Sequence, residues 1–105
     1  RLMRNTAFHG NREMNTLIRL LIKEDIPFEV VPVILAEEPS LQICYPSSHN
    51  CILDAVSHHF SYGGNKGLIE LMGEGDVTNY DVVGWLTAEE ALKYFVKVFH
   101  QGFEG

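Results

Sequence analysis

The sequence predicts an α+β domain in which a four-stranded antiparallel sheet is flanked by an N-terminal and a C-terminal helix, in the order α-β-β-β-β-α. Apolar residues recur at helical spacing near both ends of the chain, short Val- and Ile-rich segments lie between them, and turn-forming residues separate these segments. The 105 residues are 46% hydrophobic and 10% aromatic, as in ordinary globular proteins. No repeat or linker divides the chain, so we expect residues 1–105 to form one domain with both helices on one face of the sheet.

The first predicted helix spans residues 12–24. One face carries apolar residues at the i, i+3, i+4, i+7 spacing of a helix, namely Met14, Leu17, Ile18 and Leu21. Pro27 disfavours helical geometry at the residue before it, so we expect the helix to end near Asp25.

A hairpin is predicted to follow this helix. Residues 28–35 are rich in Val and Ile, but Pro32 cannot donate a ladder hydrogen bond and therefore indicates an edge strand or a bulge. Residues 37–40 have turn chemistry, and residues 41–45 alternate in polarity, which places Gln42 and Cys44 on the face opposite the apolar residues. These two segments form the predicted hairpin.

Two more strands complete the predicted sheet. Polar residues 46–50 form a turn before a strand at 51–60, and the glycines of residues 63–67 supply the positive-φ positions of a tight turn before a strand at 68–72. Residues 81–85 read as a brief extended piece rather than a sheet strand.

The second helix has a clear N-terminal signal. Thr87 and Glu90 have the spacing of a capping box, and Leu86 and Ala91 occupy the hydrophobic staple positions, so the helix should begin at Ala88. Its apolar face continues to Phe99, and we expect Gly102 to follow the helix as its C′ residue.

Charge is distributed unevenly along the chain. The net charge of −6 divides into +3 for residues 1–24 and −9 for residues 25–105. Nucleic-acid binding requires a cationic face, so the acidic body argues against direct binding to nucleic acid. An acidic surface suits a basic protein partner, and it also serves solubility alone.

Potentially reactive side chains are concentrated between residues 44 and 59. The hairpin brings Cys44 and Cys51 near each other, and with His49 and either His58 or His59 they could supply four zinc ligands. The two cysteines are farther apart along the chain than in zinc knuckles, and the adjacent histidines point to opposite sheet faces. We therefore expect two reduced thiols and assign no catalytic residue, metal ligand or cofactor.

Other motifs give weaker signals. A nucleophilic triad of Cys51 or Ser57 with Asp54 and a nearby histidine fails because neighbours on one strand cannot converge on one point. Asp54 and Glu70 could hold a divalent cation, but Met72 stands where a nuclease has a lysine. The glycines of 63–67 lack the helix-opening Gly-Lys-Ser/Thr of a phosphate loop, and the acids of 74–81 lack the spacing of a calcium loop.

Five segments together carry a family resemblance: residues 43–47, 51–58, 61–63, 67–73 and 83–90. They resemble a small uncharacterised family of phages, prophages and Gram-positive (Firmicute) bacteria, over roughly residues 13–100. The resemblance implies a preceding helix that ends in an Ile-Pro-Phe-Glu segment, which is present at residues 26–29. The family carries no assigned activity, so the resemblance implies a phage or mobile-element setting but no mechanism.

Two functions of different classes follow. The first is a non-enzymatic accessory protein of a phage or mobile element that binds a protein, in its strongest form an acidic inhibitor of a basic, nucleic-acid-handling host protein. The alternative is a small metal-dependent or thiol enzyme built on Cys44, His49, Cys51 and His58. The absence of a long apolar stretch, and of a secretory signal in residues 1–4, predicts a cytoplasmic protein without membrane contact.

Self-association is also expected. Val31 and Val33 lie on the strand face opposite Val30, so this strand is apolar on both sides, whereas two helices cover only one sheet face. A second copy in a homodimer or a partner protein would then cover the other face. The competing possibility is that the loop around Trp85 and the apolar residues of segment 2–8 fold over it.

Overall fold

The computed structural model describes residues 11–35, 38–58, 61–73 and 82–102. The chain runs through the following elements: α1 (Arg12–Lys23), β1 (Glu29–Leu35), β2 (Glu38–Pro46), β3 (Cys51–Val56), the short 3₁₀ helix η3 (Gly64–Lys66), β4 (Ile69–Gly73), β5 (Val82–Leu86) and α2 (Ala88–Gly102). The predicted α+β class is confirmed.

The strands form one antiparallel meander in the order β1-β2-β3-β4-β5. The prediction of four strands is wrong, because residues 82–86 pair with β4 as a fifth strand. Two other boundaries also differ from the sequence prediction. β2 already begins at Glu38, inside the expected turn, and β3 ends at Val56 instead of running to residue 60.

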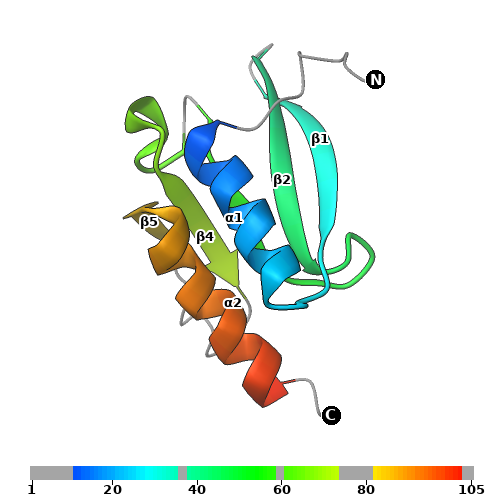
Figure 1. The fold of residues 1–105 in the computed structure, drawn as a ribbon. Coiled ribbons are helices and arrows are strands. Elements are labelled where there is room, and N and C mark those ends of the chain that lie inside the picture. Colours follow the sequence, from blue (N-terminus) through cyan, green and yellow to red (C-terminus); the bar gives the residue numbers. More distant parts are fainter. Residues whose placement is uncertain (1–10, 36–37, 59–60, 74–81, 103–105) are drawn as a thin grey trace.

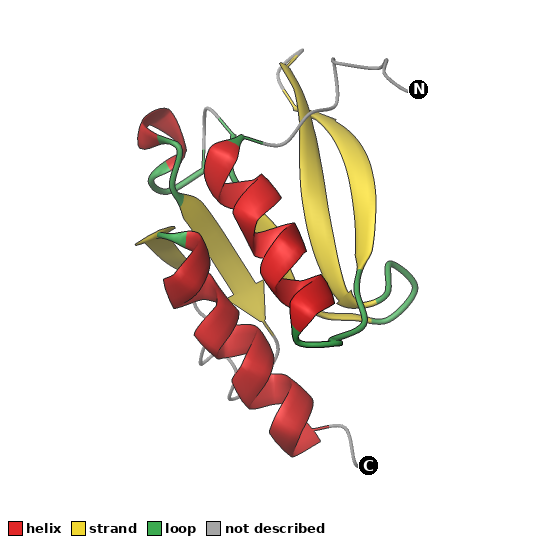
Figure 2. Cartoon of the chain, in the orientation of Figure 1, coloured by secondary structure: helices red, strands yellow, loops and turns green. Residues whose placement is uncertain are grey.

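Both helices cover the same face of this sheet and lie side by side (Figure 1 and Figure 2), as predicted. The resulting two-layer core is closely packed, and the rings of Tyr45 on β2 and Phe95 on α2 meet edge to face at 6.2 Å between centroids. The buried core residues come from both helices, the three central strands and the α1–β1 connection: Met14, Leu17, Leu21, Ile26, Ile43, Tyr45, Leu53, Ala55, Ile69, Leu71, Ala88, Ala91, Phe95 and Val98. The opposite face of the sheet therefore carries no helix among the described residues.

The first helix follows its predicted face. Three of its four predicted core residues are buried, and Ile18 is partly buried. Asn11 caps the helix by accepting a hydrogen bond from the Met14 amide at 3.0 Å, and its own amide group donates to Ser57 Oγ at 2.7 Å. This cap ties the start of α1 to the end of β3.

The predicted capping box of α2 is confirmed. The Thr87 amide donates to Glu90 Oε1 at 2.9 Å, and the Glu90 amide donates to Thr87 Oγ1 at 3.2 Å. Gly102 is the last helical residue, not the residue after the helix, so that boundary was wrong by one position.

The predicted edge strand and the positive-φ glycines are confirmed, but residues 57–68 connect β3 to β4 through η3 and not through a tight turn. Pro32 lies on β1, which is an outer strand of the sheet, so its missing amide hydrogen costs no bond to a further strand. Gly63 and Gly67 have φ values of 89° and 76° on either side of η3. Within the described part of the chain, no helix is long and apolar enough to cross a membrane.

Candidate functional site

The helix-free face of the sheet, here called the open face, presents the side chains that alternate with the core residues. Cross-strand partners share a face, and the register pairs Cys44 with Asp54, Asp54 with Met72, and Val56 with Glu70. Polar and acidic groups from β2, β3 and β4 therefore lie in neighbouring positions on this face.

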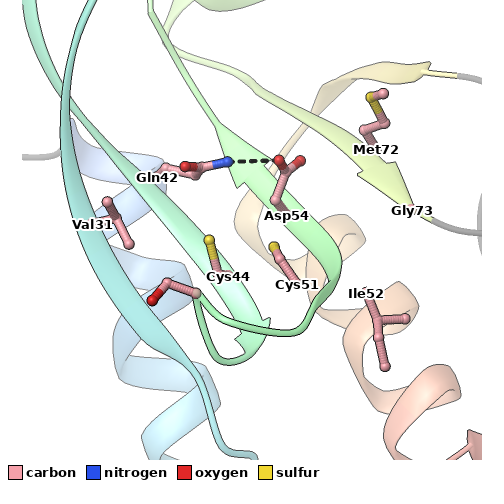
Figure 3. Close-up of a pocket in the computed structure, with 9 residues that line it drawn as sticks. Val31, Gln42, Cys44, Cys51, Ile52, Asp54, Met72 and Gly73 are labelled. Atoms are coloured by element: carbon pink, nitrogen blue, oxygen red, sulfur yellow. Dashed lines mark hydrogen bonds between the residues drawn. The ribbon is translucent and has the colours of Figure 1, made fainter.

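A pocket of about 550 Å³ opens on the part of this face nearest the β2–β3 turn (Figure 3). Its polar groups come from β2, β3 and the turn, and its apolar groups come from β1, β3 and β4. The lining residues are Val31, Gln42, Cys44, Ser48, Cys51, Ile52, Asp54, Met72 and Gly73. Its volume lies within the range of small-ligand and side-chain binding pockets.

Asp54 is the acidic group of the pocket. Gln42 Nε2 donates a 2.7 Å hydrogen bond to Asp54 Oδ2 across the β2–β3 pair (Figure 3). Desolvation raises the pKa of the Asp54 carboxyl above its ordinary value, and the negative charge of Glu70 on the next strand adds to this effect, while the Gln42 bond opposes it. The fold thus holds a carboxylate in a place where ionisation is unfavourable.

The two cysteines lie together in the same pocket, as the hairpin predicted (Figure 3). Both are free thiols, and Cys44 is buried. Burial raises the pKa of the Cys44 thiol, and burial together with the Cys44 contact raises the pKa of Cys51 to about 12. Thiols with raised pKa values stay protonated at neutral pH and are poor nucleophiles.

The histidines considered as zinc ligands do not join this thiol pair. His49 is exposed in the β2–β3 turn, where the neighbouring Ser48 amide donates to Glu29 Oε1 at 2.7 Å. His58 follows the other end of β3, about 20 Å along the strand from Cys51. His59 lies outside the described residues. Among the residues that the structure describes, no group of three or more His, Cys, Asp or Glu side chains could hold a metal ion.

Ser57, a candidate nucleophile in the sequence, has a structural role. Its hydroxyl donates to the Leu68 carbonyl at 2.7 Å and accepts the Asn11 amide, so it joins the start of α1 to the approach to β4. Asp54 instead lies in the pocket on the open face, where it bonds to Gln42. The structure therefore does not assemble the proposed triad.

The opposite end of the open face is covered in part by the chain itself. The Tyr62 amide donates to Glu70 Oε1 at 2.8 Å, and the Trp85 amide donates to the Tyr62 carbonyl at 3.2 Å. A Cβ at Gly84 would lie only 2.2 Å from Tyr62 Cβ, which explains the glycine there. The covering segment is thus residues 61–63, whereas the Trp85 side chain stays 55% exposed. The predicted cover from segment 2–8 lies outside the described residues.

Charge separates by element in this fold. Among the side chains that the structure describes, the strands carry three acidic residues, Glu29, Asp54 and Glu70, and neither Lys nor Arg. The basic residues of the described chain lie on α1, η3 and α2. The sheet layer is therefore the acidic side of the molecule.

Comparison of the chain with protein-family models, with curated proteins and with solved structures found no match.

Proposed function

We propose that this chain is a non-enzymatic accessory protein that binds a basic protein partner on the open face of its sheet. The observation that carries this proposal is the separation of charge: the strands hold acidic residues without Lys or Arg, and the helices lie on the other face. Complementary charge raises association rates and selects partners of opposite sign.

The pocket chemistry favours binding over catalysis. The thiols of Cys44 and Cys51 are held protonated by burial, so neither is an activated nucleophile. Gln42 and Asp54 bond to each other on the open face, and their polar atoms can meet a partner's donors. The alternative thiol enzyme needs a group that favours the thiolate, but His58 lies past the far end of β3, and burial, to which the Asp54 carboxylate in the pocket adds, raises the pKa of both thiols.

The partner class follows from the same charge, and the family resemblance adds only the phage or mobile-element setting. A basic surface that binds nucleic acid is the kind of surface an acidic sheet can mask. A phage or mobile-element accessory protein that inhibits a host nucleic-acid-handling protein would act in this way.

The charge of the open face disfavours a homodimer formed through this face. Two copies placed face to face would oppose two faces that each carry Asp54 and Glu70 without Lys or Arg on the strands, and like charges oppose association. We therefore assign the open face to a partner of opposite charge.

The test compares capture of host proteins by charge variants. The triple variant Glu29→Gln, Asp54→Asn, Glu70→Gln removes three acids of the sheet layer but keeps every hydrogen-bond acceptor named above. The matched control Glu24→Gln, Glu89→Gln removes exposed acids at the ends of the helices. Both are used as bait in lysate of a Gram-positive host.

We expect wild type and control to retain the same basic protein and the triple variant to lose it. Equal retention by all three forms, or the absence of any specifically retained basic protein, would contradict the proposal.

A further inference from the structure

We propose that the pocket on the open face binds one arginine side chain of the partner, with the Asp54 carboxylate as its counter-ion. This inference rests on the proposed function, since it names the group that the open face recognises. The experiment below is chosen so that either proposal can fail without the other.

The shape and lining of the pocket suit such a side chain. Long basic side chains bury their methylene stems along apolar surface while the charged head meets a polar group. Val31 on β1 and Met72 on β4 supply apolar surface on either side of the Gln42–Asp54 pair. A stem between these side chains would bring its cationic head to the carboxylate.

The Asp54 carboxylate can accept hydrogen bonds from a cationic head group. A carboxylate has about four acceptor positions; Gln42 occupies one at Oδ2, and the Met72 backbone amide also donates to this carboxylate, which leaves about two for a ligand. Glu70 lies one cross-strand position away along the sheet, so the local charge is negative, and the strands offer no internal Lys or Arg to neutralise it. A cation from outside the chain would pair with Asp54 in the pocket, whereas Glu70 already accepts the Tyr62 amide.

A guanidinium fits this environment better than an ammonium. It is planar, pairs with a carboxylate through two parallel hydrogen bonds, and is more weakly hydrated, so it loses less on entering a half-buried pocket. The carboxyl group itself is a poor contributor to the fold, because burial and Glu70 both oppose its ionisation. A partly buried carboxylate with a shifted pKa in a pocket is typical of functional sites.

The probe is an acetylated hexa-arginine peptide, titrated into ¹⁵N-labelled protein and followed by amide chemical shifts. Hexa-lysine and hexa-citrulline peptides serve as comparisons, since citrulline keeps the planar shape without the charge. Asp54→Asn is the test variant and Glu89→Gln, on the exposed side of α2, is the matched control.

We expect shifts centred on Gln42, Asp54 and Met72, affinity for hexa-arginine at least about tenfold above that for either other peptide, and a loss of about tenfold in Asp54→Asn but not in the control. Equal binding of hexa-lysine overturns the guanidinium assignment. Shifts elsewhere, or an unchanged Asp54→Asn affinity, overturn the pocket. If the host-lysate test succeeds while this one fails, the partner binds the open face without an arginine in the pocket.

Discussion

At the scale of single residues, the pocket combines groups whose ionisation the fold opposes. Asp54 and the thiols of Cys44 and Cys51 all have pKa values raised first by desolvation. The sequence predicted that the two cysteines would be close, because a hairpin joins them. It could not predict the Gln42–Asp54 bond, which depends on the β2–β3 register and on the irregularity beside Pro46.

The raised pKa of Asp54 has a consequence for stability. The native state binds this proton more tightly than the unfolded state, so ionisation at neutral pH lowers stability, and lowering the pH through the raised native pKa restores it. Asp54→Asn should therefore have a Tm at pH 7 equal to or above that of wild type. The difference should close as the pH falls to the ordinary Asp value of 3.8. Thermal denaturation across pH measures this, and a Tm several degrees lower in the variant at pH 7 would show that the carboxylate stabilises the fold.

The thiols should be reduced and slow to react. Raising the Cys51 pKa from 9.0 to about 12 lowers its thiolate fraction about 1000-fold at neutral pH. Iodoacetamide should label the native protein far more slowly than the protein in denaturant, with mass spectrometry as the readout. A quantitative Cys44–Cys51 disulfide in native protein, or equal labelling rates, would contradict this account.

At the scale of elements, local signals predicted the helices and long-range contacts decided the remaining boundaries. The capping box and the face of α1 are local patterns, and both were correct. β5 was missed because it has five residues, contains Gly84, and bends at Trp85, whose φ is 61°. β3 was predicted too long because Ser57 leaves the sheet to bond Asn11 and Leu68, partners that are distant in sequence.

The capping box should contribute measurably to stability. Thr87→Ala removes the acceptor for the Glu90 amide and should cost about 1 kcal/mol. For a domain of this size, that loss lowers Tm by about 4–8 °C. Thr87→Ser keeps the hydroxyl and serves as the control, so an unchanged Tm in the alanine variant would refute the role of the cap.

A second contact joins the two helices. Glu13 on α1 accepts a 2.8 Å hydrogen bond from the Ala88 amide at the start of α2, where a negative charge also complements the helix dipole. Glu13→Ala should destabilise the protein by about 1–2 kcal/mol in urea denaturation, whereas Glu13→Gln, which keeps the acceptor, should lose less. Equal loss in both variants would assign the effect to charge instead of the hydrogen bond.

At the scale of the whole molecule, the sheet layer is acidic and the helices carry most of the described basic residues. The sequence predicted an acidic body, but it could not predict that strands with acids and without Lys or Arg would form the layer opposite the helices, because that depends on strand pairing and on where the helices pack. The predicted homodimer stays a prediction.

Salt should have opposite effects on binding to a basic partner and on binding to a second copy of this chain. Raising the ionic strength from about 0.1 M to 1 M shortens the screening length from about 10 Å to 3 Å. A basic partner should bind more weakly at high salt, whereas face-to-face association of two acidic copies should strengthen. Sedimentation equilibrium at both salt concentrations, with and without the partner, measures these opposite trends, and a partner complex that strengthens with salt would contradict the electrostatic account.

The most direct test of the open face as the binding surface uses the methionine methyl groups. Met72 lies on the open face, and its side chain is 51% exposed. Met14 lies on the core-facing side of α1, and its side chain is 1% exposed. In ¹³C-methyl-methionine spectra recorded while the captured basic partner is added, we expect the Met72 signal to shift or broaden and the Met14 signal to stay in place. A complex that leaves Met72 unchanged would contradict the assignment of function to the open face.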